Sequence, residues 1–458
     1  MKRNRYTTIL LMSILTLLSL NSCDEYLDID PKGQRLLKTV DDYNLWLNNQ
    51  KLQESAMMGL IYLSDHCDMP EITDVWDNFK DLTYNWQSQL SDEPHTNSPI
   101  WGEIYSHIYY YNAVINDVND ATGGTDEERQ SLRAEALLGR SFLYLGLTNL
   151  YGKVYNEATA DQDLAVPFVT SIDVTDDTPD RSTVQEMYDH IIADINEAIP
   201  DLPLDNSTNR YRGSVAAAYG VLARAYFYMG KYSLAAENAQ LALDNGPNVI
   251  AMQNVEEMSE LLTRSDAIYA REASGSVIIG VLPPLDFMKK FDTNDQRLPF
   301  HYSGLEDFSF ESRGTVKYEW HSTIINMKFY PNWGISVAEM RLIMAEAAAR
   351  AGDTTTACDQ LDLIRSKRFL PEDYVEFRST NADAVLEKIL LERELELPFH
   401  GVRWFDMRRL AAEGRMPTVN RYDGRGSVIS TLEPNSDRYV LQIPLEVMDY
   451  NPGWEQNP

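Results

Sequence analysis

Apolar and small residues recur every three or four positions through residues 214–247, which is the spacing of two helices that pack against each other. Small side chains at the contact allow the two helix axes to come close. The length and order of the pattern are typical of a tetratricopeptide-like helical hairpin. Its positions are Leu222, Ala223 and Tyr226 in the first helix, Gly230 and Tyr232 at the turn, Ala235, Ala239 and Ala242 in the second helix, and Pro247 at the end.

A second copy of this pattern covers residues 339–369, with Ala345, Ala348, Gly352, Ala357, Leu361 and Ile364 at equivalent positions. Weaker helical pairs are predicted for residues 100–121 with 127–151, and for residues 183–199 with the start of the first copy. A further pair joins residues 383–398 to 402–413 through a turn at Gly401. Because three or more such units stack around a shared core, the sequence predicts a mainly α protein with a scaffold of tetratricopeptide-like hairpins.

Two long stretches lack helical periodicity, residues 52–99 and 249–334. They are rich in turn-forming residues, and one short β-type run, SVIIGVL, occupies residues 276–282. Loops of this length inside a compact domain usually carry function or structure of their own. We therefore expect long irregular loops and a few short strands to carry a ligand site on the helical scaffold.

Residues 1–22 have the composition of a signal peptide, with Lys2, Arg3 and Arg5 followed by an apolar run at residues 9–20. This run is too short to cross a bilayer as a helix. Leu20-Asn21-Ser22-Cys23 resembles the cleavage site of bacterial lipoproteins, which predicts Cys23 as the site of lipid attachment. Residues 23–34 form an acidic tether, and residues 35–458 are predicted to be a single domain with parts at 35–250 and 251–458. The alternative to lipid attachment is an ordinary secretory signal with a chance cysteine. The acidic stretch after Cys23 resembles an export tag of surface lipoproteins, and the alternative is a plain solvated linker.

The charge of the chain limits its partners. Removal of residues 1–22 takes away three basic and no acidic residues, which changes the formal charge from −30 to −33. A field of this sign repels polyanions, so we expect no nucleic acid partner and favour a neutral ligand such as a sugar or a peptide. Cys67 and Cys358 could pair, although Cys358 lies in a helical stretch and is expected in the core. No zinc-type spacing, cofactor motif or nucleophile elbow is present, so neither a cofactor nor a metal is predicted.

A dense group of charges occurs near the last helical pair. These charges share helix faces, which favours a structural ion-pair network between packed helices. The alternative is a catalytic role. A glycosidase needs two carboxylates at a set separation, which sequence cannot measure. The chain is therefore predicted not to be an enzyme. The group comprises Glu392, Arg393, Glu394, Glu396, Arg403, Asp406, Arg408 and Arg409, with Arg341 and Glu346 in the preceding hairpin.

Tryptophans in the two long loop stretches are the candidate ligand contacts. An aromatic ring stacks on the apolar face of a sugar, while neighbouring polar side chains bind its hydroxyls. Trp46, Trp101 and Trp404 are expected in the core, and Trp454 in the C-terminal tail. The alternative for each loop tryptophan is that it anchors its loop to the core, and His66, His301 and His321 are taken as ordinary loop histidines. The candidates are Trp76, Asp77, Tyr84, Trp86, Gln87, Tyr318, Trp320, Tyr330 and Trp333.

Four stretches together resemble the SusD/RagB family of outer-membrane nutrient-binding lipoproteins. They are CDEYLDIDPKGQ at 23–34, RAEALLGRSFLYLGLTNLYGKV at 133–154, LERELELPFHGVRWFDMRRL at 391–410 with Met340-Arg341-Leu342 and Ala345-Glu346-Ala347 before it, and the close of the chain at Ile443-Pro444, Asn451-Pro452 and Gln456-Asn457-Pro458. One departure is His400-Gly401, where the family commonly has Glu-Gly.

The resemblance implies a cell-surface lipoprotein that is anchored in the outer membrane by its acylated cysteine and faces the exterior. It would capture an oligosaccharide, or a peptide, and pass it to a SusC-like TonB-dependent transporter without catalysis. The alternative is a helical-repeat lipoprotein that acts as a scaffold of envelope assembly from a periplasmic anchor, with no small-molecule ligand.

Overall fold

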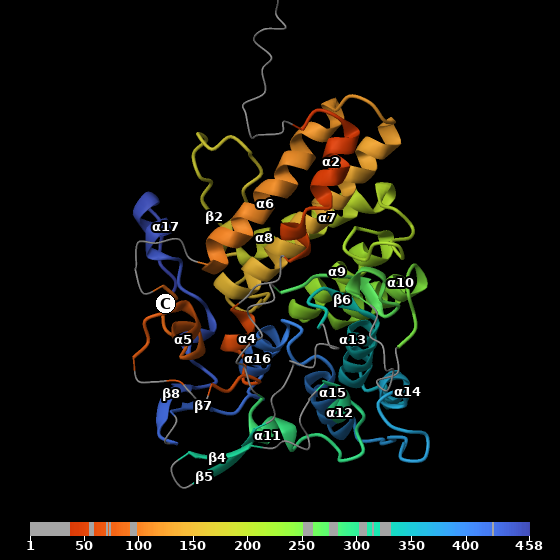
Figure 1. Cartoon of the computed structure of the whole chain (residues 1–458), viewed down its shortest axis with the longest axis vertical. Coiled ribbons are helices and arrows are strands. Elements are labelled where there is room, and N and C mark those ends of the chain that lie inside the picture. The colour runs from red at the N-terminus through yellow and green to blue at the C-terminus, as the bar shows by residue number, and fades with distance from the viewer. Residues whose placement is uncertain are drawn as a thin grey trace, which may run out of the picture.

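The computed structural model describes residues 37–54, 59–69, 72, 75–91, 99–250, 260–273, 283–301, 309–313, 316–320, 331–423 and 426–458. The long helices of these ranges are α6 (Pro99–Asp117), α7 (Asp126–Tyr151), α8 (Val184–Ala198), α9 (Val215–Tyr228), α10 (Tyr232–Asp244), α13 (Val337–Arg350), α14 (Thr354–Arg365), α15 (Ala382–Glu396) and α16 (Arg403–Ala412). Shorter helices are α2 (Val40–Leu47), α3 (Gln50–Gln53), α4 (Leu60–Leu63), α5 (Phe79–Tyr84), α11 (Leu285–Met288), α12 (Arg297–His301) and α17 (Leu445–Tyr450). Figure 1 shows the long helices packed side by side through the length of the molecule.

The hairpin predicted at residues 214–247 is confirmed as α9 and α10. The Ser214 side chain caps α9 by accepting a hydrogen bond from the Ala217 amide, which satisfies an otherwise free donor. Gly230 turns the chain with a φ of 70°, a conformation that favours glycine. Ala235 and Ala239 are fully buried against α9, so the small residues lie where the repeat pattern placed them.

The other predicted helices all form, but two of the predicted pairs have other partners. The second copy forms α13 and α14, and Gly352 occupies the left-handed region at their turn. Residues 383–398 and 402–413 form α15 and α16, with Gly401 in the same conformation, but α15 packs mainly against α13 and α16 packs against α4, so the two helices are not a packed pair. Residues 183–199 form α8, which packs mainly against α7 and only slightly against α9. The prediction that residues 183–199 pair with the first copy was therefore wrong. Their main partner is α7, which is long enough to pack against both α6 and α8.

Strands are short and occur as antiparallel pairs among the described residues. These pairs are β1 (Leu164–Pro167) with β2 (Arg181–Thr183), β3 (Ala267–Tyr269) with β6 (Ile335–Ser336), β4 (Ser309–Arg313) with β5 (Val316–Trp320), and β7 (Val419–Tyr422) with β8 (Val428–Leu432). The predicted β-type run at 276–282 lies outside the described residues. The structure confirms the predicted fold class, a mainly α protein built from tetratricopeptide-like hairpins with a few short strands.

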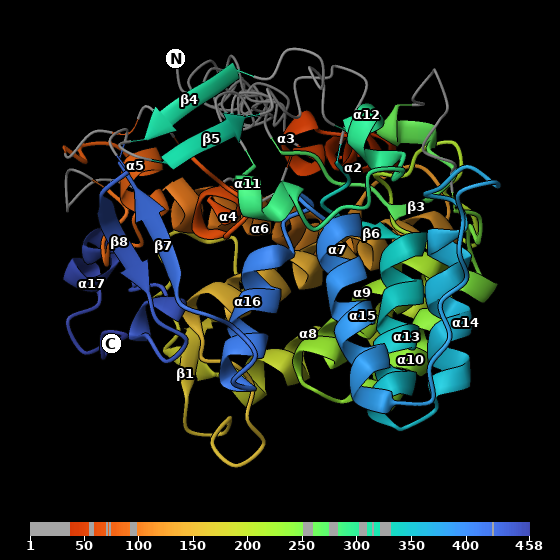
Figure 2. The same ribbon diagram turned by 90° about the horizontal axis from the view of Figure 1, so that it is seen from below.

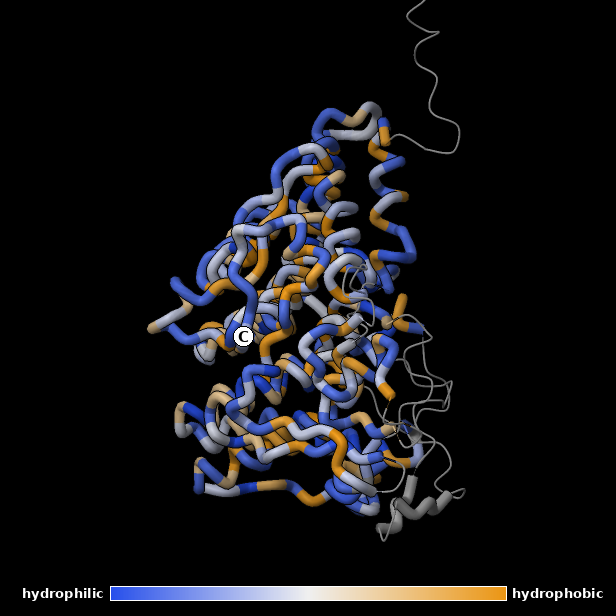
Figure 3. The backbone as a smooth tube through the Cα atoms, turned by 90° about the vertical axis from the view of Figure 1, so that its left-hand side faces the viewer, coloured by the Kyte–Doolittle hydropathy of each residue, from blue (hydrophilic) through white to orange (hydrophobic). Residues whose placement is uncertain are grey.

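Buried apolar side chains from Val40 to Ile443 form one large cluster, and a smaller cluster lies between α13, α14 and α15. Figure 3 shows hydrophilic and hydrophobic segments interspersed along the backbone. None of the helices in the described part of the chain is long and apolar enough to cross a membrane.

The two long stretches between the helical units meet on one face of the molecule. The first supplies α4 and α5, and the second supplies α11 and the β4–β5 hairpin. Figure 2 shows these elements beside the β7–β8 hairpin. Contacts join α4 to α5 and to α16, and α11 to β5. We call this assembly of α4, α5, α11, β4–β5 and β7–β8 the loop-built face.

Candidate functional site

A cavity of about 280 Å³ opens in the loop-built face. Its walls come from segments that are far apart in the chain, which the fold brings together. They are residues 65–68 after α4, Tyr84 at the end of α5, Pro284, Asp286, Phe287 and Lys290 in and around α11, Glu394 on α15, and residues 417–422 leading into and along β7. The cavity therefore draws on both loop stretches in which the site was expected.

An ion-pair network forms one wall of the cavity. The Arg403 guanidinium binds both carboxylate oxygens of Asp65, with Nε–Oδ1 and Nη2–Oδ2 distances of 2.7 and 2.6 Å. Glu394 lies next to it and accepts from the Lys290 ammonium. Burial would raise the pKa of Asp65 and Glu394, but Arg403 outweighs it, and the pKa of Glu394 falls to about 2. Both carboxylates are therefore ionised and already paired at neutral pH.

His66 lines the cavity in its neutral form. Its Nε2 lies 3.2 Å from Glu394 Oε1, and burial lowers the pKa of the imidazole despite the neighbouring carboxylates. The ring packs on Phe287 with centroids 4.2 Å apart. Its Nδ1 is buried and has no hydrogen-bond partner among the described residues.

The strand side of the cavity offers a ring and an amide. Tyr422 and Asn420 are half-buried, and both line the opening. Asn420 accepts a hydrogen bond from Thr431 on β8 at 2.9 Å through Oδ1. At the mouth, Asp286 and Lys290 are exposed. The cavity thus combines an aromatic ring with several polar groups of both signs, the composition that binds a neutral polyhydroxylated ligand.

Arg421 fixes the geometry of this region. Its guanidinium is buried and donates to four backbone carbonyls of the α4–α5 segment, at distances of 2.6–3.1 Å. These are the carbonyls of Tyr62, Ser64, Cys67 and Tyr84. The same guanidinium lies over the rings of Tyr84 and Trp86, at 4.2 and 4.4 Å from their centroids. One side chain therefore joins β7 to the α4–α5 segment and holds the cavity open.

Three predicted aromatic contacts are packed in the protein interior. Trp86 is 1% exposed, and its Nε1 donates to the Leu63 carbonyl at 2.9 Å. Tyr84 lines the cavity but is equally buried, with its hydroxyl bound to Asp68. Trp333 is 4% exposed and packs against Gly401, where any β-carbon would meet its ring. These side chains anchor loops to the core, so we do not carry Trp86 or Trp333 into the proposed site.

The remaining predicted residues that the structure describes lie in segments next to α5 and in β5. Trp76 is half-buried against the core, Asp77 is exposed beside it, and Gln87 is half-buried with its amide bound to the Asn85 carbonyl. Tyr318 and Trp320 belong to β5, next to α11, whereas Tyr330 lies outside the described residues. A ligand role for these side chains stays a prediction.

The residues that sequence analysis missed are His66, Asn420, Arg421 and Tyr422. His66 has no neighbour in sequence that marks it, because its partner Glu394 is 328 positions away. The dense polar run at residues 64–68 was the available signal in the first loop. Nothing in the local pattern marked Arg421, because the carbonyls that its guanidinium binds all lie more than 300 positions earlier.

The predicted ion-pair network around α15 and α16 is confirmed except for two arginines: Arg408 donates to the Gly152 carbonyl, and Arg341 donates to Gln360 and Asn248. Arg393 binds Asp406 at 2.8 Å, and Arg409 binds Glu346 on α13 at 2.6 Å. Cys67 and Cys358 are both buried and free. Within the described ranges, no cluster of His, Cys, Asp and Glu could hold a metal ion.

Comparison with known proteins identifies the family. Residues 25–227 match the family described as "Starch-binding associating with outer membrane", and residues 321–458 match the SusD family. The chain belongs to the SusD/RagB family. SusD-like protein P38 of Formosa agariphila is 24% identical over 89% of this chain and 92% of its own length. SusD-like protein P2 of the same organism is 23% identical over 80% and 82%, respectively.

Solved structures share the SusD/RagB fold. A SusD superfamily protein from Bacteroides thetaiotaomicron superposes with a TM-score of 0.74 at 21% identity, covering 92% of this chain and all of that one. A SusD-like carbohydrate binding protein from Bacteroides vulgatus gives a TM-score of 0.70 at 18% identity, with coverage of 91% and 97%. In this SusD/RagB protein, the His400 Nδ1 donates to the Pro398 carbonyl at 2.8 Å, within the turn itself.

Proposed function

We propose that this protein is a cell-surface lipoprotein that captures an oligosaccharide and delivers it to a SusC-like TonB-dependent transporter of the outer membrane. Cys23 would carry the lipid, and residues 23–34 would form an acidic tether that faces the exterior. These residues lie outside the described ranges, so the support comes from the signal-peptide pattern of the sequence and from family membership. The protein would act by binding alone and not as an enzyme.

The observation that carries the proposal is the cavity of the loop-built face. Its buried carboxylates Asp65 and Glu394 are paired with Arg403 and Lys290, so these two groups offer little free charge to an ionic ligand. Tyr422 can stack on the apolar face of a sugar, while the half-buried Asn420 can bind its hydroxyls. A volume of about 280 Å³ is at the low end for ligand pockets, which suits the capture of a short stretch of a longer glycan.

Titration calorimetry of the mature chain with maltoheptaose, mannohexaose and a neutral hexapeptide would test this proposal. We expect one of the two oligosaccharides to bind and the Tyr422→Ala variant to bind it at least tenfold more weakly. Trp46→Ala removes a similarly half-buried ring outside the cavity and should bind like the parent. Binding of the peptide alone would contradict the sugar assignment, and equal binding by both variants would contradict the site.

Delivery to a transporter is tested separately, by purification of the tagged chain from outer membranes in mild detergent. A SusC-like transporter should copurify with it, and protease applied to intact cells should remove the domain.

A second candidate function, a scaffold of envelope assembly, is favoured by the burial of Trp86 and Trp333, since such a protein needs no exposed aromatic platform. It predicts that the domain survives protease treatment of intact cells and that none of the ligands binds.

A further inference from the structure

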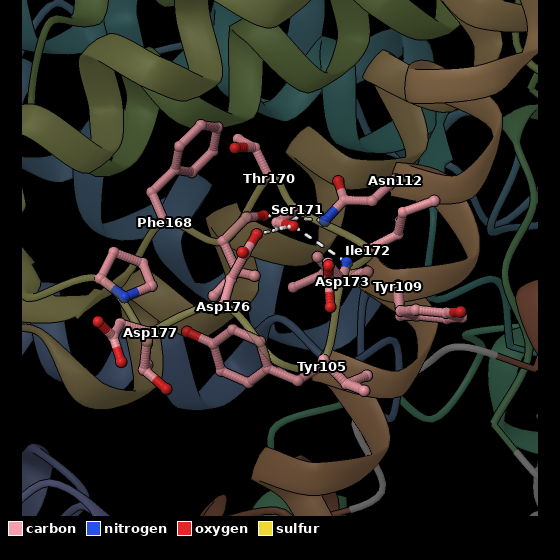
Figure 4. A pocket seen from close by; sticks show the side chains of 15 residues that line it. Tyr105, Tyr109, Asn112, Phe168, Thr170, Ser171, Ile172, Asp173, Asp176 and Asp177 are labelled. Carbon is pink, nitrogen blue, oxygen red and sulfur yellow. Dashed lines mark hydrogen bonds between the residues drawn. The ribbon is translucent and has the colours of Figure 1, made fainter.

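A second, larger cavity lies away from the loop-built face and shares none of its lining residues. It has a volume of about 620 Å³ and lies between α6 and the connection from β1 to β2 (Figure 4). We call residues 169–180 of this connection the acidic arm, because they include Asp173, Asp176, Asp177 and Asp180. The arm projects from the body of the molecule beside α6 (Figure 1).

The root of the arm is held rigidly by side chains of two helices. On α6, Asn112 and Asn116 donate to the carbonyls of Val169 and Thr170, each at 2.9 Å. On α7, the Tyr144 hydroxyl donates to the Val169 carbonyl at 3.0 Å. A surface that is ordered before binding loses less entropy when a partner docks. The groove between arm and helix is therefore already formed.

Apolar side chains from both walls face this groove. Tyr105, Ile108 and Tyr109 follow one face of α6, and Ile172 and Val174 come from the arm. Tyr109 is 43% exposed and Val174 is 89% exposed, so each leaves apolar surface in water at the edge of one cavity. Exposed apolar groups gathered in one groove are typical of a binding surface, whereas single ones are not.

The charge of the lining selects the partner. The lining residues, all of them in the described range 99–250, include Asp173, Asp176 and Asp177 but no Lys, Arg or His. A hydrogen bond from Thr175 lowers the pKa of Asp173, which keeps this carboxylate ionised. Three carboxylates at the edge of an apolar groove attract a cationic group and repel an anionic one.

The groove is less suited to a sugar. The Tyr105 hydroxyl is bound to the Pro167 carbonyl at 2.8 Å. Asn112 is engaged at both ends, because its Oδ1 also accepts from Arg140 at 2.9 Å. The planar polar groups that would bind sugar hydroxyls are thus occupied, and carboxylates dominate the remaining polar chemistry.

We infer that this groove docks a basic segment of a protein partner, in which a Lys or Arg meets the acidic arm and a neighbouring apolar side chain packs on Tyr109 and Val174. This inference rests on the groove alone and is independent of the proposed sugar site. It requires the partner segment to carry an excess of positive charge, and it predicts that the association weakens as ionic strength rises.

Site-specific photo-crosslinking in cells that produce the full chain tests this inference. Benzoylphenylalanine placed at Val174 should form an adduct with a protein, and peptide mapping should locate it in a segment with more Lys and Arg than Asp and Glu. The same probe at Val249, which is exposed outside the groove, should give no such adduct.

Charge dependence is measured with two triple variants that carry the probe at Val174. Asp173→Asn with Asp176→Asn and Asp177→Asn should reduce the adduct at least fivefold. Glu127→Gln with Glu237→Gln and Asp383→Asn, which removes the same charge from exposed positions elsewhere, should leave it unchanged. Equal thermal unfolding of both variants would show that the fold is intact.

The inference is overturned if no protein adduct forms above the Val249 level, if the adduct maps to a neutral or acidic segment or to carbohydrate, or if both triple variants behave alike. Sugar binding by these variants should match the parent, so a failure of this inference remains distinct from a failure of the proposed sugar site.

Discussion

The helical scaffold and the loop-built face are stabilised by interactions of very different range. In the scaffold, neighbouring helices pack through small residues such as Ala235 and Ala239, and buried ion pairs join α13, α15 and α16. In the loop-built face, Arg421 alone binds four carbonyls of a segment more than 330 positions earlier. A periodic sequence thus builds the support, whereas a few long-range side chains shape the cavity.

The largest expected effect is in the scaffold. Glu346 is completely buried and binds Arg409 and Arg350. Glu346→Ala removes a buried carboxylate from between two guanidinium groups, which leaves Arg409 with Asp406 alone, so we expect the free energy of unfolding to fall by about 3 kcal/mol in urea denaturation. The matched change Glu197→Ala breaks a surface pair with Arg133 and should lower it by less than about 1 kcal/mol. Similar losses of unfolding free energy in both variants would contradict the expectation that the buried ion pair stabilises the scaffold more than the surface pair.

Arg421→Met tests the loop-built face. It keeps the apolar stem but leaves the carbonyls of Tyr62, Ser64, Cys67 and Tyr84 without their donor, for an expected loss of about 3 kcal/mol. Hydrogen exchange should accelerate in residues 60–69 and 79–87 and stay unchanged in α9 and α10. Arg438→Met, at an exposed position, is the control. Uniform acceleration through the helices would show that the two regions do not unfold separately.

A smaller, pH-dependent effect belongs to His107 on α6. Burial lowers its pKa to about 4, while the unfolded chain takes up a proton near pH 6.5. Between these values the unfolded state binds more protons, so this histidine destabilises the fold as the pH falls from 6.5 to 4. His107→Gln should remove about 2 kcal/mol of that loss. Denaturation curves at pH 7 and pH 4.5 measure it, and an unchanged difference between them would contradict the assignment.

Trp76→Ala should have the smallest effect. Trp76 is half-buried at the edge of the loop-built face, and if its ring extends the sugar surface, the affinity should fall about fivefold with little loss of stability. Trp46→Ala is again the matched control, because this ring is similarly half-buried and binds the Tyr110 carbonyl. If Trp76→Ala and Trp46→Ala bind the sugar with equal affinity, Trp76 is not a ligand contact and the site is limited to the cavity.

The helical units could be predicted because their information is local. Gly230, Gly352 and Gly401 mark turns between periodic helices, and all three adopt the left-handed conformation that their positions require. The site could be predicted only as a region, because aromatic residues in loops look alike whether they are exposed or packed. Trp86 is held in the core by Leu63 and Arg421, and the latter lies 335 positions away, so no local pattern marks it as buried.

The long-range character of the cavity also explains why its polar residues escaped notice. His66 and Glu394, or Asp65 and Arg403, become neighbours only when α4 packs on α16. Both ion pairs join residues that are more than 300 positions apart, so neither can form before the chain has folded around the helices.

The most direct test of the central claim, that the cavity of the loop-built face binds the ligand, is hydrogen exchange of the mature chain with and without a saturating oligosaccharide that it binds. We predict increased protection in residues 64–69, 284–290 and 418–422, with no change in the acidic arm or in α9 and α10. Protection confined to any other part of the chain would contradict the account.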